Sequence, residues 1–588
     1  MSDREPVEWI EIDYDFCPLV FGVGDCSATL GGSVKYKCFN TTETCADREA
    51  LLTAGLGVLT LRFIQPRANL PKGATWFPCL ESVSGSSSSV NIAGANPDLA
   101  PLGKRATVTA KGWDFPYHDR LTDKYQVERL SGAAQLDGVG YRPEDHGTFF
   151  TRLRARWPFY AGRPMRRCTG YLDGGVLTTE AVRHFIITDM AIDGRGWTIE
   201  GKDILDLADD KRVQAPKPVN GVLAADIDAV AMALTLSPAG IGDLQYPASG
   251  FACIGSELVQ FTRSADAVTL VARGVSGTAV STHSLGDSFQ TSFSPRRKKL
   301  VPVIYSLLVD HAGIDPAFID LTAWNAEVNR WAPTLRLTAD ICKPEGVAKL
   351  IGELAILGVS IWWDEVAQKI GLKMNRPPDT DAVKALSDRN NLLEIEIEDR
   401  DEDRITTVQF FSVMLDPTRS PTDSNSYARQ RYLVDAGAVS AQEFGDSRVK
   451  QIHCRWLNHG DDAAVAVMGR RFLQTFVRAP QRIKMLVDAA DDMSLTAVAT
   501  LDTREVRSPT GQAAEQFIQI AARKEKVAGH RVQLTGQAYS FGKKRPGYIT
   551  ENTRPDYASS SEDQRARGFY ISDSAGKMSD GSDGYRMI

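Results

Sequence analysis

The chain has 588 residues, several times the length of a typical domain, so about four folding units are expected. Its composition of 43% hydrophobic, 24% charged and 8% aromatic residues excludes a wholly disordered chain, a collagen-like repeat and a disulfide-dense toxin. The formal net charge of -6 argues against a protein whose main task is to bind nucleic-acid phosphates.

The sequence predicts neither a signal peptide nor a membrane segment. The N-terminus is polar and acidic, whereas a signal peptide begins with basic and then apolar residues. The most apolar long stretch, 347–363, is interrupted by Lys349 and Glu353, and it is shorter than the roughly 20 apolar residues that a bilayer requires. We therefore expect synthesis in the cytoplasm, where the nine cysteines are thiols or metal ligands rather than disulfides.

Four of the nine cysteines, Cys17, Cys26, Cys38 and Cys45, lie within 29 residues near the N-terminus, among several glycines. Four thiolates that converge on one point suit a zinc ion or an iron–sulfur cluster. Structural zinc sites usually contain two cysteines separated by two to four residues, and this segment has no such pair. The long spacers and flanking aromatic residues favour a 4Fe-4S cluster, with zinc, two disulfides or four core cysteines as the alternatives.

Most of the remaining chain is predicted to form short strands. Partly alternating segments bounded by turn residues indicate half-buried strands at 105–111, 184–190, 197–200, 258–263, 268–273 and 394–398. Apolar residues at helical spacing predict helices at 300–312, 347–357 and 463–477. The predicted fold class is therefore α+β, β-rich and multidomain.

Turn-rich and charged segments suggest where the units meet. A Ser-Gly run at 84–89, the Pro216-Lys-Pro218 segment and the basic run 296–299 are typical of exposed connections. The predicted units are a cysteine-ligated cap at 1–65, a β-rich domain at 66–215, a small β domain at 216–299, an α/β domain at 300–400, a second β-rich domain at 401–545 and a C-terminal arm at 546–588.

Other groupings of polar residues are weaker candidates for functional sites. They are His453, Cys454 and His459; Asp114, His118 and Asp119; Asp364 and Glu365; Cys342; and the basic groups at 163–167 and 296–299. Adjacent residues on a strand point to opposite faces, which argues against a metal site or a carboxylate pair. We expect ordinary packing for the two histidine-containing groups and for Asp364 and Glu365. Nothing in the sequence supports a cysteine protease at Cys342, and we expect the two basic groups to lie in hydrated loops.

The sequence resembles tail-tip and baseplate hub proteins of long-tailed, non-contractile bacteriophages (siphoviruses) and of gene transfer agents. The resemblance extends from about residue 10 to about residue 545, and the four-cysteine region is its most specific part. The segments that carry it are 15–30, 37–47, 102–119, 147–160, 273–278 with His283, Gly286 and Asp287, 342–347 and 361–365.

The resemblance implies a non-enzymatic virion protein at the tail tip, with β-barrel-like hub domains. It implies a trimer that closes the tail tube, adapts six-fold to three-fold symmetry and acts in tail assembly and genome ejection. The ligands of its 4Fe-4S cluster would be Cys17, Cys26, Cys38 and Cys45. Implied partners are the distal tail ring, the tape measure protein and tip fibres or receptor-binding proteins, with viral DNA passing through the ring.

The resemblance leads to one further structural expectation, and one other class of function competes with it. If two β units of one chain occupy equivalent ring positions, the regions around 66–215 and 401–545 are the candidates for the duplication. The competing class is an enzyme, either an iron–sulfur redox enzyme or a tail-associated cell-wall hydrolase. We find neither a glycine-rich dinucleotide fingerprint nor a phosphate-binding P-loop in the sequence.

Overall fold

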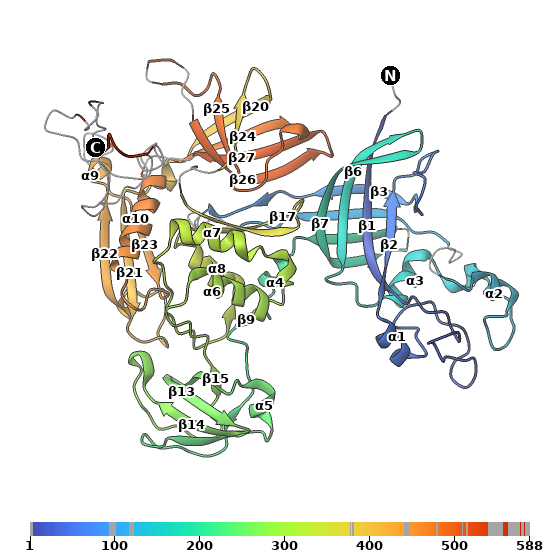
Figure 1. Cartoon of the computed structure of the whole chain (residues 1–588), viewed down its shortest axis with the longest axis horizontal. Helices are drawn as coiled ribbons and strands as arrows, with labels where there is room; N and C mark the ends of the chain where they lie inside the picture. Colours follow the sequence, from blue (N-terminus) through green and yellow to red (C-terminus); the bar gives the residue numbers. More distant parts are fainter. Residues whose placement is uncertain are drawn as a thin grey trace.

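The fold was analysed in a computed structural model. It describes residues 4–92, 102–116, 123–194, 196–376, 378, 381–439, 446–477, 480–508, 510–512, 516–538, 557–561, 577 and 581. Most of the expected arm at 546–588, together with His118 and Asp119, thus lies outside the described residues. The chain is β-rich, as the sequence predicted, and Figure 1 shows a helical centre with groups of strands around it. None of the helices in the described ranges has the length and apolar composition to cross a bilayer.

The N-terminal unit is an antiparallel seven-stranded sheet with the order β2-β1-β6-β7-β8-β5-β3. Its strands are β1 (Glu5–Phe16), β2 (Gly57–Ile64), β3 (Leu80–Gly85), β5 (Thr107–Trp113), β6 (Pro164–Asp173), β7 (Val176–Ile192) and β8 (Gly196–Lys202). Phe63 and Trp197 pack inside it against Phe150 of helix α3 (Phe149–Arg156). Because β1 and β2 belong to this sheet, the boundary expected at residue 65 runs through one folded unit.

The basic group at 163–167 does not form a hydrated loop. Strand β6 pairs with β1, which carries alternating carboxylates on the same face. Arg163 binds Asp15 at 2.5 Å, and Arg166 binds both Asp13 at 2.5 Å and Glu11 at 3.0 Å. Opposite charges on facing strands stabilise their pairing. The sequence prediction was wrong here because the acidic partner strand lies about 150 residues earlier in the chain.

The small β domain is a six-stranded sheet with the order β10-β11-β14-β13-β12-β15. Its elements are β10 (Val222–Leu223), β11 (Ala233–Ser237), α5 (Ile241–Gln245), β12 (Ser249–Ile254), β13 (Glu257–Ser264), β14 (Ala267–Ala272) and β15 (Phe289–Thr291). A disulfide joins Cys253 of β12 to Cys342 in the central unit. The expectation of nine thiols or metal ligands is therefore corrected for these two cysteines, which lie 89 residues apart in sequence.

A buried carboxylate organises one end of the small domain. Glu257 has no exposed surface and accepts hydrogen bonds from Arg273 at 2.9 and 2.8 Å, with His283 Nε2 2.9 Å away. The backbone N–H of Ser281 donates to the same carboxylate at 3.0 Å. Burial opposes ionisation, but the hydrogen bonds from Arg273, His283 and Ser281 outweigh it and lower the pKa of Glu257 to about 2.

This lowered pKa predicts acid sensitivity of the small domain. The folded-state pKa lies below the ordinary value of 4.5, so the stabilisation is complete above about pH 4.5 and is lost as the pH falls toward 2. Over that window we expect a loss of about 3 kcal/mol of local stability. Hydrogen exchange of β13 and β14, measured at pH 5 and at pH 3, checks this. Equal local opening free energies at the two pH values would contradict it.

The central unit is helical and shares one core with the segment that follows it. It contains α4 (Asp206–Asp209), α6 (Leu300–Ser306) continued by the π-helical turn η4 (Leu307–His311), α7 (Leu321–Trp331), α8 (Val347–Ala355) and the hairpin β17 (Val359–Asp364) and β18 (Lys369–Met374). Two short strands, β9 (Gln214–Ala215) and β16 (Glu345–Gly346), pair beside them. The three helices predicted from apolar spacing are confirmed.

The same core includes helix α10 (Asp462–Phe476) and the three-stranded sheet β22-β21-β23. The strands are β21 (Thr407–Met414), β22 (Tyr427–Val434) and β23 (Val449–Cys454), with α9 (Ala436–Val439) after β22. Arg455 ties this segment to the central unit by binding both Glu345 and Glu353 at 2.7 to 2.9 Å. The core therefore crosses the boundary expected at residue 400.

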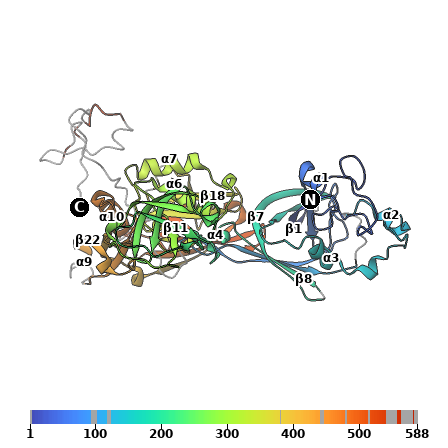
Figure 2. The same cartoon turned by 90° about the horizontal axis from the view of Figure 1, so that it is seen from below.

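The C-terminal sheet has the order β19-β25-β26-β27-β24-β20. Its strands are β19 (Val383–Ser387), β20 (Leu392–Asp399), β24 (Gln481–Asp488), β25 (Val498–Asp502), β26 (Gln516–Val527) and β27 (Arg531–Ala538). A seventh strand, β4 (Ser88–Ser89), comes from the N-terminal unit and pairs antiparallel with β26. Figure 2 shows the N-terminal unit at one end of an elongated molecule, with β7 close to the narrow connection.

The two large sheets repeat one strand order. In the first sheet β6-β7-β8-β5-β3 are neighbours, and in the second β25-β26-β27-β24-β20 are neighbours. If the five strands of each set are numbered 1 to 5 in chain order, both sheets have the neighbour order 3-4-5-2-1. All neighbouring pairs in both sets are antiparallel. The next strand differs in direction, since β1 is antiparallel to β6 and β19 is parallel to β25. The chain therefore contains two units of similar topology.

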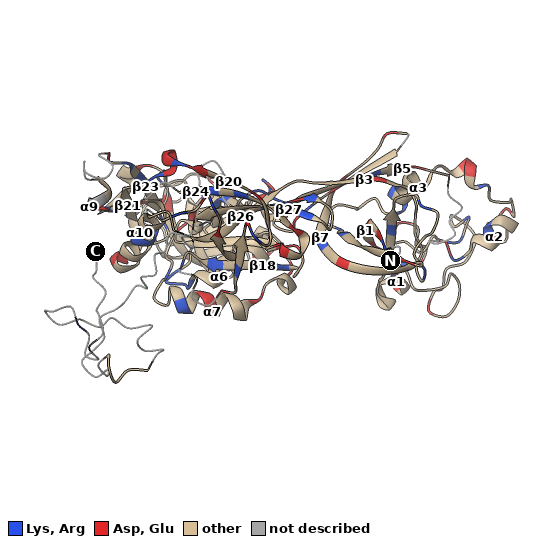
Figure 3. Ribbon diagram, turned by 90° about the horizontal axis from the view of Figure 1, so that it is seen from above, with Lys and Arg blue, Asp and Glu red and all other residues tan. Residues whose placement is uncertain are grey.

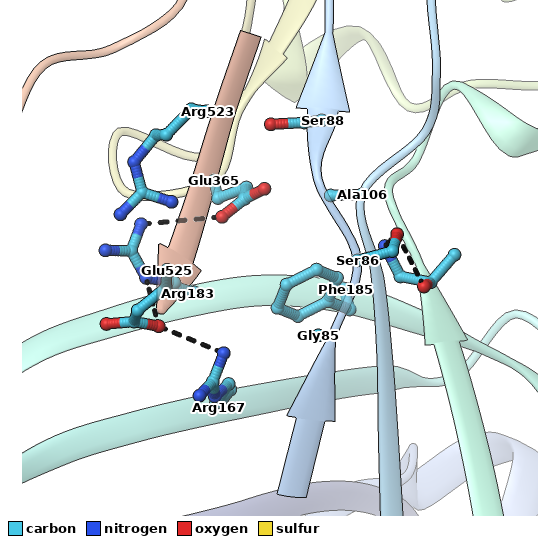
Figure 4. Close-up of a pocket in the computed structure, with 11 residues that line it drawn as sticks. Gly85, Ser86, Ser88, Ala106, Arg167, Arg183, Phe185, Glu365, Arg523 and Glu525 are labelled. Carbon is cyan, nitrogen blue, oxygen red and sulfur yellow. Dashed lines mark hydrogen bonds and ion pairs between the residues drawn. The ribbon is translucent and has the colours of Figure 1, made fainter. Parts of the chain in front are cut away.

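An ionic cluster holds the two sheets together. Figure 4 shows Arg167 and Arg183 of the N-terminal sheet facing Glu525 of β26 and Glu365 of the β17–β18 turn. Arg167 lies 3.0 Å from Glu525, and Arg183 lies 3.2 Å from Asp492 and 3.5 Å from Glu365. All five side chains are at most 22% exposed. Elsewhere Figure 3 shows positive and negative residues intermixed along the chain.

Replacement of Arg183 with glutamine is expected to loosen this junction. The variant leaves Glu365, Asp492 and Glu525 without one of their cations, and breaking such a buried network costs about 3 kcal/mol. Hydrogen exchange across β4 and β26 and the first thermal transition both report the loss. Arg212→Gln is the control, because the Arg212 side chain is 90% exposed and its removal costs about 0.5 kcal/mol or less. Equal behaviour of the two variants would contradict the prediction.

Candidate metal centre

The four clustered cysteines lie in one loop between two regular elements. Cys17 follows the last residue of β1, and the loop ends where helix α1 (Arg48–Ala54) begins. The left-handed backbone of Gly22, with φ of 68°, lets the loop turn back on itself, and a Cβ there would lie 2.9 Å from the carbonyl oxygen of Ala28. Cys17 and Cys38 are buried, whereas Cys26 and Cys45 are half-buried.

The loop brings the four sulfur atoms into mutual electrostatic range. Burial raises the pKa of the Cys38 thiol, and the charges of Cys45, Cys17 and Cys26 raise it further. Burial likewise raises the pKa of Cys45, with Cys17 and Cys26 adding to the effect. Four thiolates this close repel one another unless a cation neutralises them. The four predicted ligands therefore lie close enough within one loop to influence one another's ionisation.

Backbone N–H groups act on two of these sulfurs. The N–H of Asn40 lowers the pKa of Cys38, and the N–H of Asp47 lowers the pKa of Cys45, in opposition to burial. A hydrogen bond to a thiolate stabilises the charged form, which is the form that binds a metal. Burial outweighs these contacts, so the pKa of both thiols stays above its ordinary value.

Asn40 is the residue that closes the loop on Cys17. It is fully buried in left-handed conformation, with φ of 58°. Its backbone oxygen accepts from the N–H of Cys17 at 2.8 Å, and its side-chain Nδ2 donates to the carbonyl oxygens of Cys17 at 3.1 Å and Leu19 at 2.9 Å. Its Oδ1 atom is buried and has no hydrogen-bond partner among the described residues.

Asp47 links the second half of the loop to the first. Its carboxylate accepts from the backbone N–H and the hydroxyl of Ser27, both at 2.7 Å, and caps α1 through the N–H of Ala50 at 3.1 Å. The hydrogen bonds from Ser27 and Ala50 lower the pKa of this carboxyl. Ser27 follows Cys26 and Asp47 lies two residues after Cys45, so this contact draws two of the ligands together.

The spacing of the thiols bears on the kind of group they fit. Within the described residues no three His, Cys, Asp or Glu side chains are placed as ligands of a single metal ion. A mononuclear site draws its thiolates around one ion at about 2.3 Å each. In a 4Fe-4S cluster each cysteine binds a different iron, so the sulfurs stand further apart. In this structure the four thiols are therefore not arranged as the ligands of one mononuclear ion.

Among the described residues, the other predicted polar groups form no metal site. His453 stacks on Phe411, whereas Cys454 is buried in the core beside Trp456. Asp364 accepts from the N–H groups of the turn that follows it, and Glu365 faces Arg183. Asp114 accepts hydrogen bonds from Thr148 and Phe150 at the start of α3. Cys342 forms the disulfide with Cys253, and Arg296 binds Asp340 at 2.6 Å.

Sequence reasoning missed the residues that enclose the cysteine loop. Tyr125 and Ala134 pack on Phe21, Ala28 and Cys38, although they lie about 90 to 110 residues later in the chain. Arg129 and Asp123 form an ion pair whose two side chains are 2% and 0% exposed. The only signal in the sequence is an Arg and an Asp six residues apart, a pattern common on solvated helices. Burial of that pair is a property of the tertiary structure.

No family model matches the chain, and no curated protein matches it in sequence. Solved structures similar to it include the tail protein from Neisseria meningitidis MC58, with 9% identity, 77% of this chain and 91% of that chain covered, and a TM-score of 0.34. The 43 kDa tail protein of prophage MuSo2 from Shewanella oneidensis has 10% identity, coverage of 78% and 97%, and a TM-score of 0.34. Prophage tail protein gp18 from Listeria monocytogenes EGD-e has 12% identity, coverage of 64% and 84%, and a TM-score of 0.29.

Proposed function

We propose that the chain is a structural protein of a bacteriophage tail, a hub at the tail tip that closes the tail tube in three copies. The observation that carries this is the repeated strand order of the two large sheets. Three chains with two similar units each offer six similar positions, so a ring of three matches a six-fold tube on one side and a three-fold tip on the other. Head-to-tail contacts close such a ring.

The within-chain junction indicates how neighbouring units contact each other. Strand β4 extends the second sheet. Arg167 forms an ion pair with Glu525 of that sheet, and Arg183 forms one with Asp492. A chain that joins its two units through a strand and an ionic cluster holds them as one rigid segment of the ring. In this proposal the distal tail ring, the tape measure protein and tip fibres or receptor-binding proteins contact the assembled ring, and viral DNA passes through it.

The second part of the proposal is a 4Fe-4S cluster held by Cys17, Cys26, Cys38 and Cys45. Its support is the sequence resemblance in this region, the mutual coupling of the four thiols and the N–H groups that act on Cys38 and Cys45. When bound, the cluster supplies a cross-link among four points of one loop. Few of the loop's apolar side chains are buried, so metal ligation contributes the stability that burial does not.

One preparation of the full chain, purified without air, tests both parts. Light scattering after gel filtration gives the mass of the assembly, and negative-stain electron microscopy shows whether six similar densities surround a three-fold axis. A stable monomer over the whole concentration range would overturn the hub proposal. Iron and acid-labile sulfide near four each per chain support the cluster. One zinc per chain, or no metal, would overturn it and leave the hub proposal standing.

A further inference from the structure

A segment distant in the sequence encloses the cysteine loop on one side. It comprises residues 123–136 and includes helix α2 (Gln126–Ser131), and we refer to it as the clamp. Its backbone pairs with the loop, since the N–H of Lys37 donates to the carbonyl oxygen of Ala134 at 3.0 Å and the N–H of Leu136 donates to that of Lys35 at 2.8 Å. The clamp therefore extends the backbone hydrogen bonding of the loop near Cys38.

Three side chains of the clamp donate to or accept from the loop beside its cysteines. Lys124 Nζ donates to the carbonyl oxygens of Pro18 at 2.8 Å and Leu19 at 3.0 Å, next to Cys17. The hydroxyl of Tyr125 accepts from the N–H of Phe21. Arg129 Nη2 donates to the carbonyl oxygens of Lys37 and of Cys38, the latter at 3.0 Å. These contacts reach both the first and the third cysteine.

Arg129 is held in place more firmly than a surface arginine. Its Nε donates to Asp123 at 2.6 Å, and Asp123 in turn accepts from the N–H of Tyr125 at 2.9 Å. The guanidinium lies 4.0 Å from the centre of the Phe39 ring, and that of Arg156 lies 3.8 Å from the same ring. Arg129 as a whole is 1% exposed. A buried charge persists only where its geometry is fully satisfied, and a planar guanidinium satisfies two carbonyls and one carboxylate together.

We infer that Arg129 is the positioning residue of the metal centre, fixing the backbone at Cys38 so that this sulfur faces the other three, and that the clamp and the four ligands assemble as one unit. The inference rests on the proposed metal centre for the role of Cys38 as a ligand. The contacts that fix its backbone belong to this chain alone.

Thiol alkylation of the full-length protein tests this inference residue by residue. Purified protein is treated with iodoacetamide, and peptide mass spectrometry gives the modification rate of every cysteine. In Arg129→Gln we expect Cys38 to react about tenfold faster than in the unchanged protein, as loss of buried charge-assisted hydrogen bonds permits local opening. Cys79 and Cys168, buried in the N-terminal sheet, serve as internal reporters of its fold and keep their rates.

Two further variants keep the test decisive if Arg129→Gln unfolds the unit. Lys124→Ala removes an exposed side chain and is expected to raise the rate at Cys17 about threefold, near the low end for loss of a net intramolecular hydrogen bond, without changing the rate at Cys79. Arg142→Gln, an exposed arginine just after the clamp, is the matched control and should leave all rates unchanged. Unchanged rates at both Cys38 in Arg129→Gln and Cys17 in Lys124→Ala would overturn the inference.

The metal content of the same samples separates this inference from the proposed function. If the unchanged protein holds iron and Arg129→Gln loses it while Cys79 stays protected, both stand. If the unchanged protein holds iron and Arg129→Gln retains it with an unchanged absorption spectrum and Cys38 still protected, only the positioning role fails. If the unchanged protein holds no metal, the proposed cluster fails, and the alkylation rates still decide whether Arg129 fixes Cys38.

Discussion

Replacement of Cys38 with serine is expected to remove the bound metal and to unfold the cysteine loop together with the clamp. Cys38 is buried among the other three thiols, and the loop has few other apolar contacts. Loss of a ligand lowers metal affinity by more than the roughly 10- to 100-fold that loss of an outer-shell contact costs. Iron and sulfide analysis and hydrogen exchange of residues 17–47 and 123–141 provide the measurement.

The control for this prediction is a cysteine outside the loop. Cys168 in β6 is equally buried, but its surroundings are Val7, Trp9 and Leu172. Cys168→Ala should therefore keep its full metal content, even if it lowers the stability of the sheet. A Cys38→Ser variant with unchanged iron, or a Cys168→Ala variant that loses iron, would show that the metal is bound elsewhere.

The second large effect is expected at Glu257. Glu257→Gln removes the carboxylate that faces Arg273 and His283, and it leaves the Arg273 guanidinium, whose side chain is 5% exposed, without its main partner. Breaking a buried pair in this way costs about 3 to 5 kcal/mol. We expect the small β domain to unfold in a separate, earlier thermal transition, which calorimetry of the full chain would detect.

A surface pair of the same domain provides the comparison. Asp243 binds Arg263 at 2.6 Å, but the Asp243 side chain is 72% exposed. Exposed ion pairs contribute about 0 to 1 kcal/mol, so Asp243→Asn should leave the transition almost unchanged. If both variants shift it equally, the stability of the domain does not depend on the buried carboxylate.

Local sequence patterns were reliable wherever one element decides its own conformation. Val347, Leu350, Ile351 and Leu354 recur at helical spacing, and the structure has helix α8 there, closed by the left-handed Gly358. The alternation in β13 and β14 likewise produced the expected strands. Such periodicities reflect which face of an element is buried, and a single stretch of sequence contains that information.

Errors arose where the partner of a residue lies far along the chain. The basic group at 163–167 was expected to be hydrated, because the carboxylates of β1 that bind it are about 150 residues away. Cys342 was considered alone, and its partner Cys253 is 89 residues distant. The expected cap boundary at residue 65 did not anticipate that β1 and β2 join a sheet with β6. No local pattern indicates which strands will pair.

The sequence by itself determined that the chain is β-rich, where three of its helices lie and which four cysteines share one loop. These properties follow from composition, periodicity and close spacing, which act over a few residues. Only the tertiary structure decided that the two sheets repeat a strand order, that an ionic cluster joins them and that Arg129 holds the backbone at Cys38 from 91 residues away. Those features depend on non-local contacts, whose free energy is gained only when the chain closes on itself.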